Sequence, residues 1–137
     1  MNPSTENIVK AIEDVGAERV LILPNNKNII MAAEQAAEII GIEAAVVPTK
    51  TVPEGLSAIL AFNPEADVSV NATAMTEAAS HVKTAQVTHA VRDTTIDGLT
   101  IKKGEYMGIA DGKIVTTHAS IDEVTKMLLS KVVHDDA

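Results

Sequence analysis

Polar side chains follow three apolar runs of the sequence, at the point where each run ends. Because ligands of open parallel sheets bind beyond the carboxyl ends of the strands, these segments are the first candidates for a binding site. They supply amide and hydroxyl donors, cations and two helix N-termini, which together suit an anion such as a phosphate or a carboxylate. The candidate ligand-binding or anion-binding residues are Asn25, Asn26, Lys27, Thr49, Lys50, Thr51, Arg92 and Asp93.

The same residues also suit structural roles, and this is the preferred interpretation. An asparagine between a strand and a helix commonly caps the helix, as Asn25 or Asn26 would do here. Thr51 begins a capping box, in which its side chain accepts a bond from the first turn of the helix that follows. Arg92 and Asp93 would form a surface pair that fixes a loop.

The remaining residues offer no catalytic set, so we predict neither a catalytic residue nor a metal site. The chain has no glycine-rich phosphate loop and no Gly-x-Ser-x-Gly elbow. His89 lies within an apolar run and is interpreted as a core or sheet-edge histidine. The four histidines are scattered, and only the last has neighbouring carboxylates, in the tail: His81, His89, His118 and His134. The chain by itself is not expected to be an enzyme.

Apolar periodicity and turn signals predict five helices and several short strands. The continuous apolar run at 19–23 predicts a strand buried on both faces, as in a parallel sheet. Two Asp-Gly dipeptides predict hairpin turns, at 97–98 and 111–112. The predicted helices cover 3–15, 27–40, 51–62, 71–83 and 120–133. The predicted parallel strands cover 19–23, 44–48 and 86–91, and short antiparallel runs cover 99–101, 105–110 and 113–117.

Together these elements predict a single α/β domain over residues 1–137. It would have three layers, with a small, mainly parallel sheet of three strands, flanking helices and an antiparallel β extension. In the fourth helix, Ala74, Ala78 and Val82 would face the core. The charged end of the chain carries no helix stop signal, so the chain is expected to be a fragment of a longer protein.

The composition excludes several classes of function. The formal net charge is −8 and aromatic residues make up 1% of the chain. An acidic surface without aromatic stacking platforms argues against nucleic-acid binding. No apolar run approaches the roughly 20 residues that span a bilayer, and no signal peptide is evident. Cysteine is absent, which fits a soluble, cytoplasmic protein.

Several segments together resemble a known family. They are VLILPNNKNIIMAAEQAAEI, VVPTKTVPEGLSAILAFNPEADV, QVTHAVRDTTIDG and IKKGEYMGI. These segments resemble the DegV-like carboxy-terminal region of the catalytic subunit of fatty acid kinase, in a family also described as dihydroxyacetone-kinase-like. The resemblance covers nearly the entire chain, and TKTVPEGLSA with AFNPEAD is its most specific part. It implies that the chain corresponds to the first lobe of that region.

The resemblance also implies that catalysis and partner binding belong to different domains. In that family an amino-terminal DhaL-type kinase domain binds ATP and magnesium, and a separate acyl-binding DegV-family protein presents a fatty acid for phosphorylation of its carboxyl group. The acyl phosphate then enters phospholipid synthesis. The resemblance thus implies a non-catalytic accessory domain that needs no cofactor of its own. It would bind the acyl-carrying partner and support assembly, with a homodimer as a further candidate.

One departure from the family pattern decides between two functions. Acyl-binding DegV proteins hold the fatty acid carboxylate with hydroxyl side chains, whereas here the first strand ends in Pro24, Asn25 and Asn26. Partner binding is therefore preferred, and a domain that binds or senses a fatty acid or acyl phosphate is the alternative. Tyr106 and Met107 on the antiparallel extension are candidate contacts for the partner.

Overall fold

The computed structural model describes residues 1–133, so the predictions for His134 and the tail lie outside the described residues. The chain forms two compact units, Met1–Val82 and Lys83–Ala137, and the single domain stays a prediction. Within residues 1–133, five helices, one small parallel sheet and antiparallel sheets confirm the predicted mixed α/β class. Each unit is described separately below.

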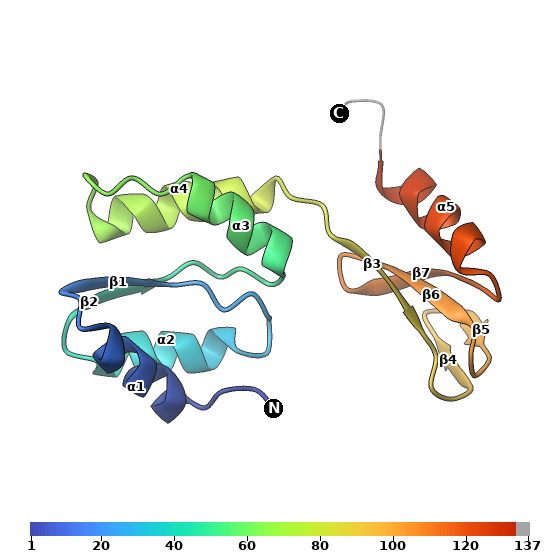
Figure 1. Cartoon of the computed structure of the whole chain (residues 1–137), viewed down its shortest axis with the longest axis horizontal. Coiled ribbons are helices and arrows are strands. Elements are labelled where there is room, and N and C mark those ends of the chain that lie inside the picture. The colour runs from blue at the N-terminus through green and yellow to red at the C-terminus, as the bar shows by residue number, and fades with distance from the viewer. Residues whose placement is uncertain (134–137) are drawn as a thin grey trace. The chain divides into compact units, whose positions relative to one another are not determined.

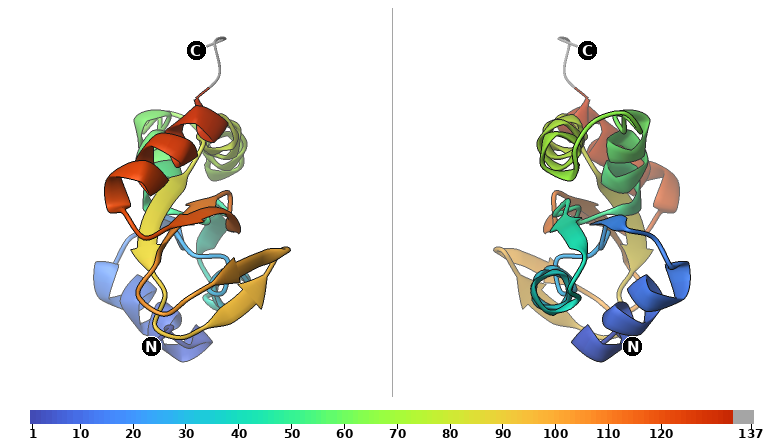
Figure 2. Two further views of the ribbon diagram at one scale, coloured as in Figure 1. Left: turned by 90° about the vertical axis from the view of Figure 1, so that its right-hand side faces the viewer. Right: turned by 90° about the vertical axis from the view of Figure 1, so that its left-hand side faces the viewer.

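The first unit has three layers, with a two-stranded parallel sheet between two pairs of helices (Figure 1). Helices α1 and α2 cover one face of the sheet, and α3 and α4 cover the other. Figure 2 shows the same sandwich from two further sides. The elements are α1 (Thr5–Val15), β1 (Arg19–Ile22), α2 (Ile30–Ile39), β2 (Glu43–Val46), α3 (Val52–Leu60) and α4 (Val68–Ser80).

Capping side chains mark the first turns of two of these helices, α1 and α3. The Ser4 hydroxyl accepts a hydrogen bond from the Asn7 N–H (3.2 Å), and Thr51 likewise accepts one from the Glu54 N–H (3.3 Å). Both bonds satisfy donors of a first helical turn that would otherwise have no partner. Gly16 ends α1 with a φ of 67°, which glycine adopts without steric cost. These local signals explain why the predictions for α1 and α3 agree closely with the structure.

The core on the α3–α4 side of the sheet is small. Val47, Ala58, Met75 and Ala79 are buried there, and the partly buried side chains of Leu21, Leu23 and Ala61 pack against them. Strand β1 pairs only with β2, with Arg19 opposite Glu43 and Ile22 opposite Val46. The strand residues of β1 are exposed or half-buried rather than fully buried, because no third strand within residues 1–133 extends the sheet.

The second unit is an antiparallel sheet with a helix packed on it. Its elements are β3 (Ala85–His89), β4 (Thr94–Ile96), β5 (Leu99–Ile101), β6 (Tyr106–Ala110), β7 (Lys113–His118) and α5 (Ile121–Val132). The strand order is β3-β6-β7, and β4 and β5 form a separate hairpin. Gly108 allows α5 to lie close to the sheet, because a Cβ there would meet side-chain atoms of Thr116 and Leu128.

Both predicted hairpin turns are confirmed. Asp97 and Gly98 connect β4 to β5 with φ values of 52° and 79°. Asp111 and Gly112 connect β6 to β7 with φ values of 49° and 81°. Two successive positive φ values match the right-handed twist of the paired strands, and this is why Asp-Gly is favoured at such turns.

Further predictions about elements are wrong. The third strand does not join the parallel sheet, because β3 pairs antiparallel with β6. Helix α2 begins at Ile30 rather than at 27, after a turn that Asn26 stabilises. In α4 the buried residues include Met75 and Ala79, not the predicted set of Ala74, Ala78 and Val82, so the helix presents a neighbouring face to the core.

Candidate functional site

Asn25, Thr49 and Gly55 interlock where β1 and β2 end and α3 begins. The Asn25 N–H donates to Thr49 Oγ1 (3.1 Å), and the Thr49 hydroxyl donates to Asn25 Oδ1 (2.8 Å). Asn25 has a φ of 56°, a left-handed conformation that asparagine adopts more readily than most residues. A Cβ on Gly55 would overlap the Asn25 side chain. We call these three residues the strand-end clamp.

The Thr49 hydroxyl, the Asn25 N–H and Asn25 Oδ1 are hydrogen-bonded within the clamp rather than directed at a ligand. The Thr49 side chain is fully buried, with 0% of the residue exposed, and its one proton is donated to Asn25. Buried polar groups are stable only when they are hydrogen-bonded, and Asn25 and Thr49 satisfy each other. Two of the predicted binding residues therefore join the strand ends to each other.

Replacing Thr49 with valine should lower the free energy of unfolding of the first unit by about 2 kcal/mol. Valine keeps the shape but leaves the N–H and Oδ1 of the half-buried Asn25 without their partner. A buried polar group that loses its partner costs about 1–3 kcal/mol. Urea unfolding followed by far-UV circular dichroism measures the loss.

Thr116→Val is the matched control for this substitution. Thr116 is also buried, but its hydroxyl contacts only the weakly accepting sulfur of Met127, at 3.5 Å. We expect its free energy of unfolding to change by less than about 1 kcal/mol. Equal losses at both positions would show that the clamp adds nothing beyond ordinary packing.

Asn26 and Lys27 lie in the turn between β1 and α2. Asn26 Oδ1 accepts from the Asn28 N–H (2.9 Å), and the Asn26 carbonyl accepts from the Ile29 N–H (3.0 Å). These bonds form a local turn of the kind that asparagine favours. The Lys27 side chain is exposed. Asn26 therefore has a structural role, and Lys27 contributes an exposed positive charge at this end of the sheet.

Lys50 and Thr51 lead into α3. The Lys50 N–H donates to Glu54 Oε2 (2.6 Å), and the Thr51 hydroxyl accepts from the Glu54 N–H. The carboxylate of Glu54 thus lies at the positive N-terminal end of α3, where an anionic ligand would otherwise be attracted. The six candidates from the ends of β1 and β2 gather at one end of the sheet, mainly as clamp, turn and cap.

Arg92 and Asp93 belong to the second unit, in the connection between β3 and β4. Asp93 Oδ1 accepts from the Lys103 N–H (2.7 Å), which ties the connection to the turn after β5. The Arg92 side chain is exposed. The prediction grouped both residues with the ends of β1 and β2 because it assumed one parallel sheet, and that reason does not hold, since β3 is antiparallel to its neighbour.

Helix α3 carries an exposed apolar surface that the prediction of a site at the polar strand ends did not include. Four large aliphatic residues recur there at helical spacing and are between 57% and 89% exposed: Val52, Leu56, Ile59 and Leu60. We call them the α3 face. The opposite side of the helix buries Gly55 and Ala58. Tyr106 and Met107, which were predicted as partner contacts, are only half-exposed within β6.

A groove of about 380 Å³ adjoins the α3 face and runs along β1. Leu21 and Leu23 line it from the strand, and Ile59 and Phe62 line it from α3 and the residues that follow. Pro64, Ala66, Val68 and Met75 complete its apolar wall. We call this the β1 groove. No sequence motif marks it, because its walls come from segments that are more than 30 residues apart.

Within residues 1–133, no three His, Asp or Glu side chains are grouped so that they could hold a metal ion. In the same described part of the chain, no helix has the length and apolar content needed to cross a bilayer.

Comparison with known proteins identifies the family. The FakA-like C-terminal family, which takes its name from the A subunit of fatty acid kinase, matches residues 1–137. The chain belongs to this family. Among its relatives, Protein YloV of Bacillus subtilis is 52% identical over 136 residues, which cover 99% of this chain and 25% of that protein. Uncharacterized proteins of Staphylococcus epidermidis and Staphylococcus aureus are 49% and 46% identical over 137 residues, all of this chain and 25% of each relative.

As a member of the FakA-like C-terminal family, the chain spans about a quarter of the length of the curated relatives that it matches. The α3 face and the β1 groove are exposed apolar surfaces of the chain. Both lie in the first unit.

Proposed function

We propose that this chain is a non-catalytic accessory domain of a fatty acid kinase, and that it binds the acyl-carrying DegV-family partner. Phosphoryl transfer from ATP, with its magnesium ion, would take place in a DhaL-type domain outside this chain. The family membership supports a role within a fatty acid kinase. The α3 face is the observation that favours partner binding.

The α3 face supports this proposal because of its composition. A helix on the surface of a protein ordinarily has one apolar stripe, which packs on the core, and a polar opposite side. In α3 the packed side is Gly55 and Ala58, yet the exposed side carries Leu56 at 61% and Leu60 at 89% exposure. Contiguous exposed apolar surface of this kind is typical of protein interaction sites.

Isothermal titration calorimetry of the 137-residue chain with the acyl-carrying DegV-family protein of the same genome tests the proposal. We expect a saturable one-to-one association and no ATP hydrolysis by the chain alone. Burial of the aliphatic side chains should also give a negative heat-capacity change, the most robust signature of apolar burial on binding. Absence of any association with the partner, whether acyl-loaded or empty, would overturn the proposal.

The second candidate function is binding of a fatty acid or an acyl phosphate, which the apolar lining of the β1 groove favours. A thermal-shift assay with palmitate and palmitoyl phosphate separates it from partner binding. A ligand at about 100 times its dissociation constant adds about 2.7 kcal/mol to the free energy of unfolding, an easily measured shift. We expect no shift, because the exposed carboxylates of Glu65 and Asp67, which alternate with lining residues of the groove, repel an anionic head group. A saturable shift would favour the second function.

A further inference from the structure

The outer edge of β1 is an unpaired strand edge. Strand β1 is parallel to β2, and the Val47 N–H donates to the Ile22 carbonyl (2.9 Å). In a parallel ladder alternate residues direct their backbone groups to the same neighbour, so Val20 and Ile22 bond to β2. Leu21 and Leu23 therefore direct their N–H and C=O groups to the other side, where no strand of residues 1–133 pairs with β1.

The β1 groove lies against this strand. Leu21 and Leu23 contribute to its wall, and Phe62 and Met75 lie among the residues that complete it. An extended segment that bonds to the backbone of Leu21 and Leu23 would direct alternate side chains toward the α3–α4 layer. An aliphatic or aromatic side chain at such a position would enter the groove. The unpaired edge and the apolar groove together are typical of a site that binds an extended peptide as an additional strand.

Charge indicates what kind of segment fits. The first unit contains eleven Asp or Glu against four Lys or Arg, a formal net charge of −7. Exposed carboxylates lie next to lining residues in the chain: Glu18 precedes Arg19, and Glu65 and Asp67 alternate with Pro64, Ala66 and Val68. Arg19 is the one cation among the lining residues that the structure describes. This rim favours a basic segment over a fatty acid carboxylate or a second, equally acidic copy.

We propose that the edge of β1 accepts an extended segment of the partner protein, which adds a third strand to the sheet. The segment places an aliphatic or aromatic side chain in the β1 groove, and lysine or arginine residues beside it meet Glu18, Glu65 and Asp67. The inference rests on the proposed function, because the segment belongs to the partner that covers the α3 face. It adds the mode of binding, which is backbone pairing.

Amide hydrogen exchange followed by nuclear magnetic resonance tests the pairing directly. In the chain alone, we expect the amides of Leu21 and Leu23 to exchange quickly, and those of Val20 and Ile22 to be protected by their bonds to β2. In the complex with the acyl-carrying partner, the amides of Leu21 and Leu23 should exchange at least about tenfold more slowly. Unchanged exchange at both amides in a saturated complex overturns the proposal.

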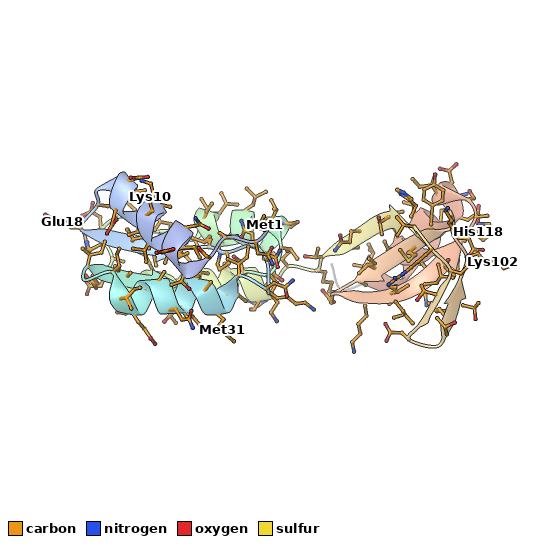
Figure 3. The ribbon with its side chains drawn as sticks, turned by 90° about the horizontal axis from the view of Figure 1, so that it is seen from below. Met1, Lys10, Glu18, Met31, Lys102 and His118 are labelled. Atoms are coloured by element: carbon orange, nitrogen blue, oxygen red, sulfur yellow. The ribbon has the colours of Figure 1, made fainter. Side chains whose placement is uncertain are left out.

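A pair of charge variants tests the acidic rim. The double substitution Glu18→Lys and Glu65→Lys changes the charge beside the groove by four units and should weaken partner binding about tenfold at low salt. The double substitution Glu34→Lys and Glu38→Lys makes the same change on the exposed side of α2, in the opposite helix layer, and should weaken it far less. Figure 3 shows Glu18 at the end of the unit beside β1. Equal effects of the two pairs overturn the basic-segment assignment.

The remaining outcomes separate this inference from the proposed function. If the partner binds but Leu21 and Leu23 stay unprotected, the proposed function stands and strand addition is wrong. If the partner does not bind at all, both fall. Protection of Leu21 and Leu23 in the chain alone, together with a dimeric mass, assigns the edge to a second copy and overturns the proposal. Protection of the Leu21 and Leu23 amides by palmitate alone would assign the edge to a lipid ligand and would also overturn the proposal.

Discussion

Replacing Gly55 with alanine should destabilise the first unit by about 2 kcal/mol, although alanine is the better helix former. At an unhindered position inside a helix the same change gains about 1 kcal/mol. At position 55 the new Cβ overlaps the Asn25 side chain, which the Thr49 hydroxyl holds in place. The overlap can be relieved only by breaking that hydrogen bond or moving α3, and either costs more than the helix propensity returns. Urea unfolding measures the difference.

The control for this prediction is the same substitution in the Asn25→Gly background, where its effect on the free energy of unfolding should change sign. Asn25→Gly removes the obstructing side chain, and glycine accepts the left-handed φ of 56° at that position without strain. In the Asn25→Gly background, Gly55→Ala should therefore stabilise the first unit by about 0.5–1 kcal/mol. A double-mutant cycle from the four proteins gives the coupling energy of the contact. Destabilisation by Gly55→Ala in both backgrounds would mean that the clamp is not the cause.

Replacing Leu56 with aspartate should weaken association with the acyl-carrying partner about 100-fold, which corresponds to about 2.7 kcal/mol. The substitution removes a large aliphatic side chain from the middle of the α3 face and places a charge where the partner would exclude water. Leu56 is 61% exposed in the chain alone, so the free energy of unfolding of the chain should change little. Calorimetry measures the affinity, and thermal unfolding confirms that the variant is folded.

Met31→Asp is the matched control for Leu56→Asp. Met31 is 71% exposed and lies on α2, in the other helix layer of the same unit (Figure 3). The same change of an exposed apolar residue to aspartate should leave the affinity within about twofold of the original value. If Met31→Asp weakens binding as much as Leu56→Asp, the partner does not select the α3 face, and net charge is the better explanation.

Sequence reasoning succeeded where a few neighbouring residues determine the structure. The two Asp-Gly turns were predicted because both φ values of such a turn are positive, which only a few residue types tolerate. The cap at Thr51 was predicted because a hydroxyl before a helix has a donor of the first turn within reach. These are local interactions, and they require no knowledge of the rest of the fold.

The predictions failed where distant segments compete. A short strand such as β3 carries no information about which strand it pairs with, so its place in an antiparallel sheet was not visible. In α4 the alanine-rich sequence offers several small-residue faces, and packing selected the one that contains Met75 and Ala79. Asn25 and Gly55 are 30 positions apart, and nothing in either neighbourhood indicates that they touch.

The spacing of the α3 face is visible in the sequence, but its exposure is not. Val52, Leu56, Ile59 and Leu60 recur at the spacing of one helical face, and each is a large aliphatic residue. The pattern is the same as that of a helix with its apolar side in the core. The packed side consists instead of Gly55 and Ala58, whose small size lets α3 lie close to its neighbours. Only the structure distinguishes the two sides.

The position of Tyr106 makes the second unit easy to observe by itself. The chain contains one tyrosine, one phenylalanine and no tryptophan, and Tyr106 lies on β6 whereas Phe62 follows α3. Intrinsic tyrosine fluorescence therefore reports on the antiparallel sheet alone, while far-UV circular dichroism is dominated by the four helices of the first unit. Both signals can be recorded in one denaturant titration. The comparison will show whether a substitution in the clamp changes the stability of residues 83–133 or only that of the first unit.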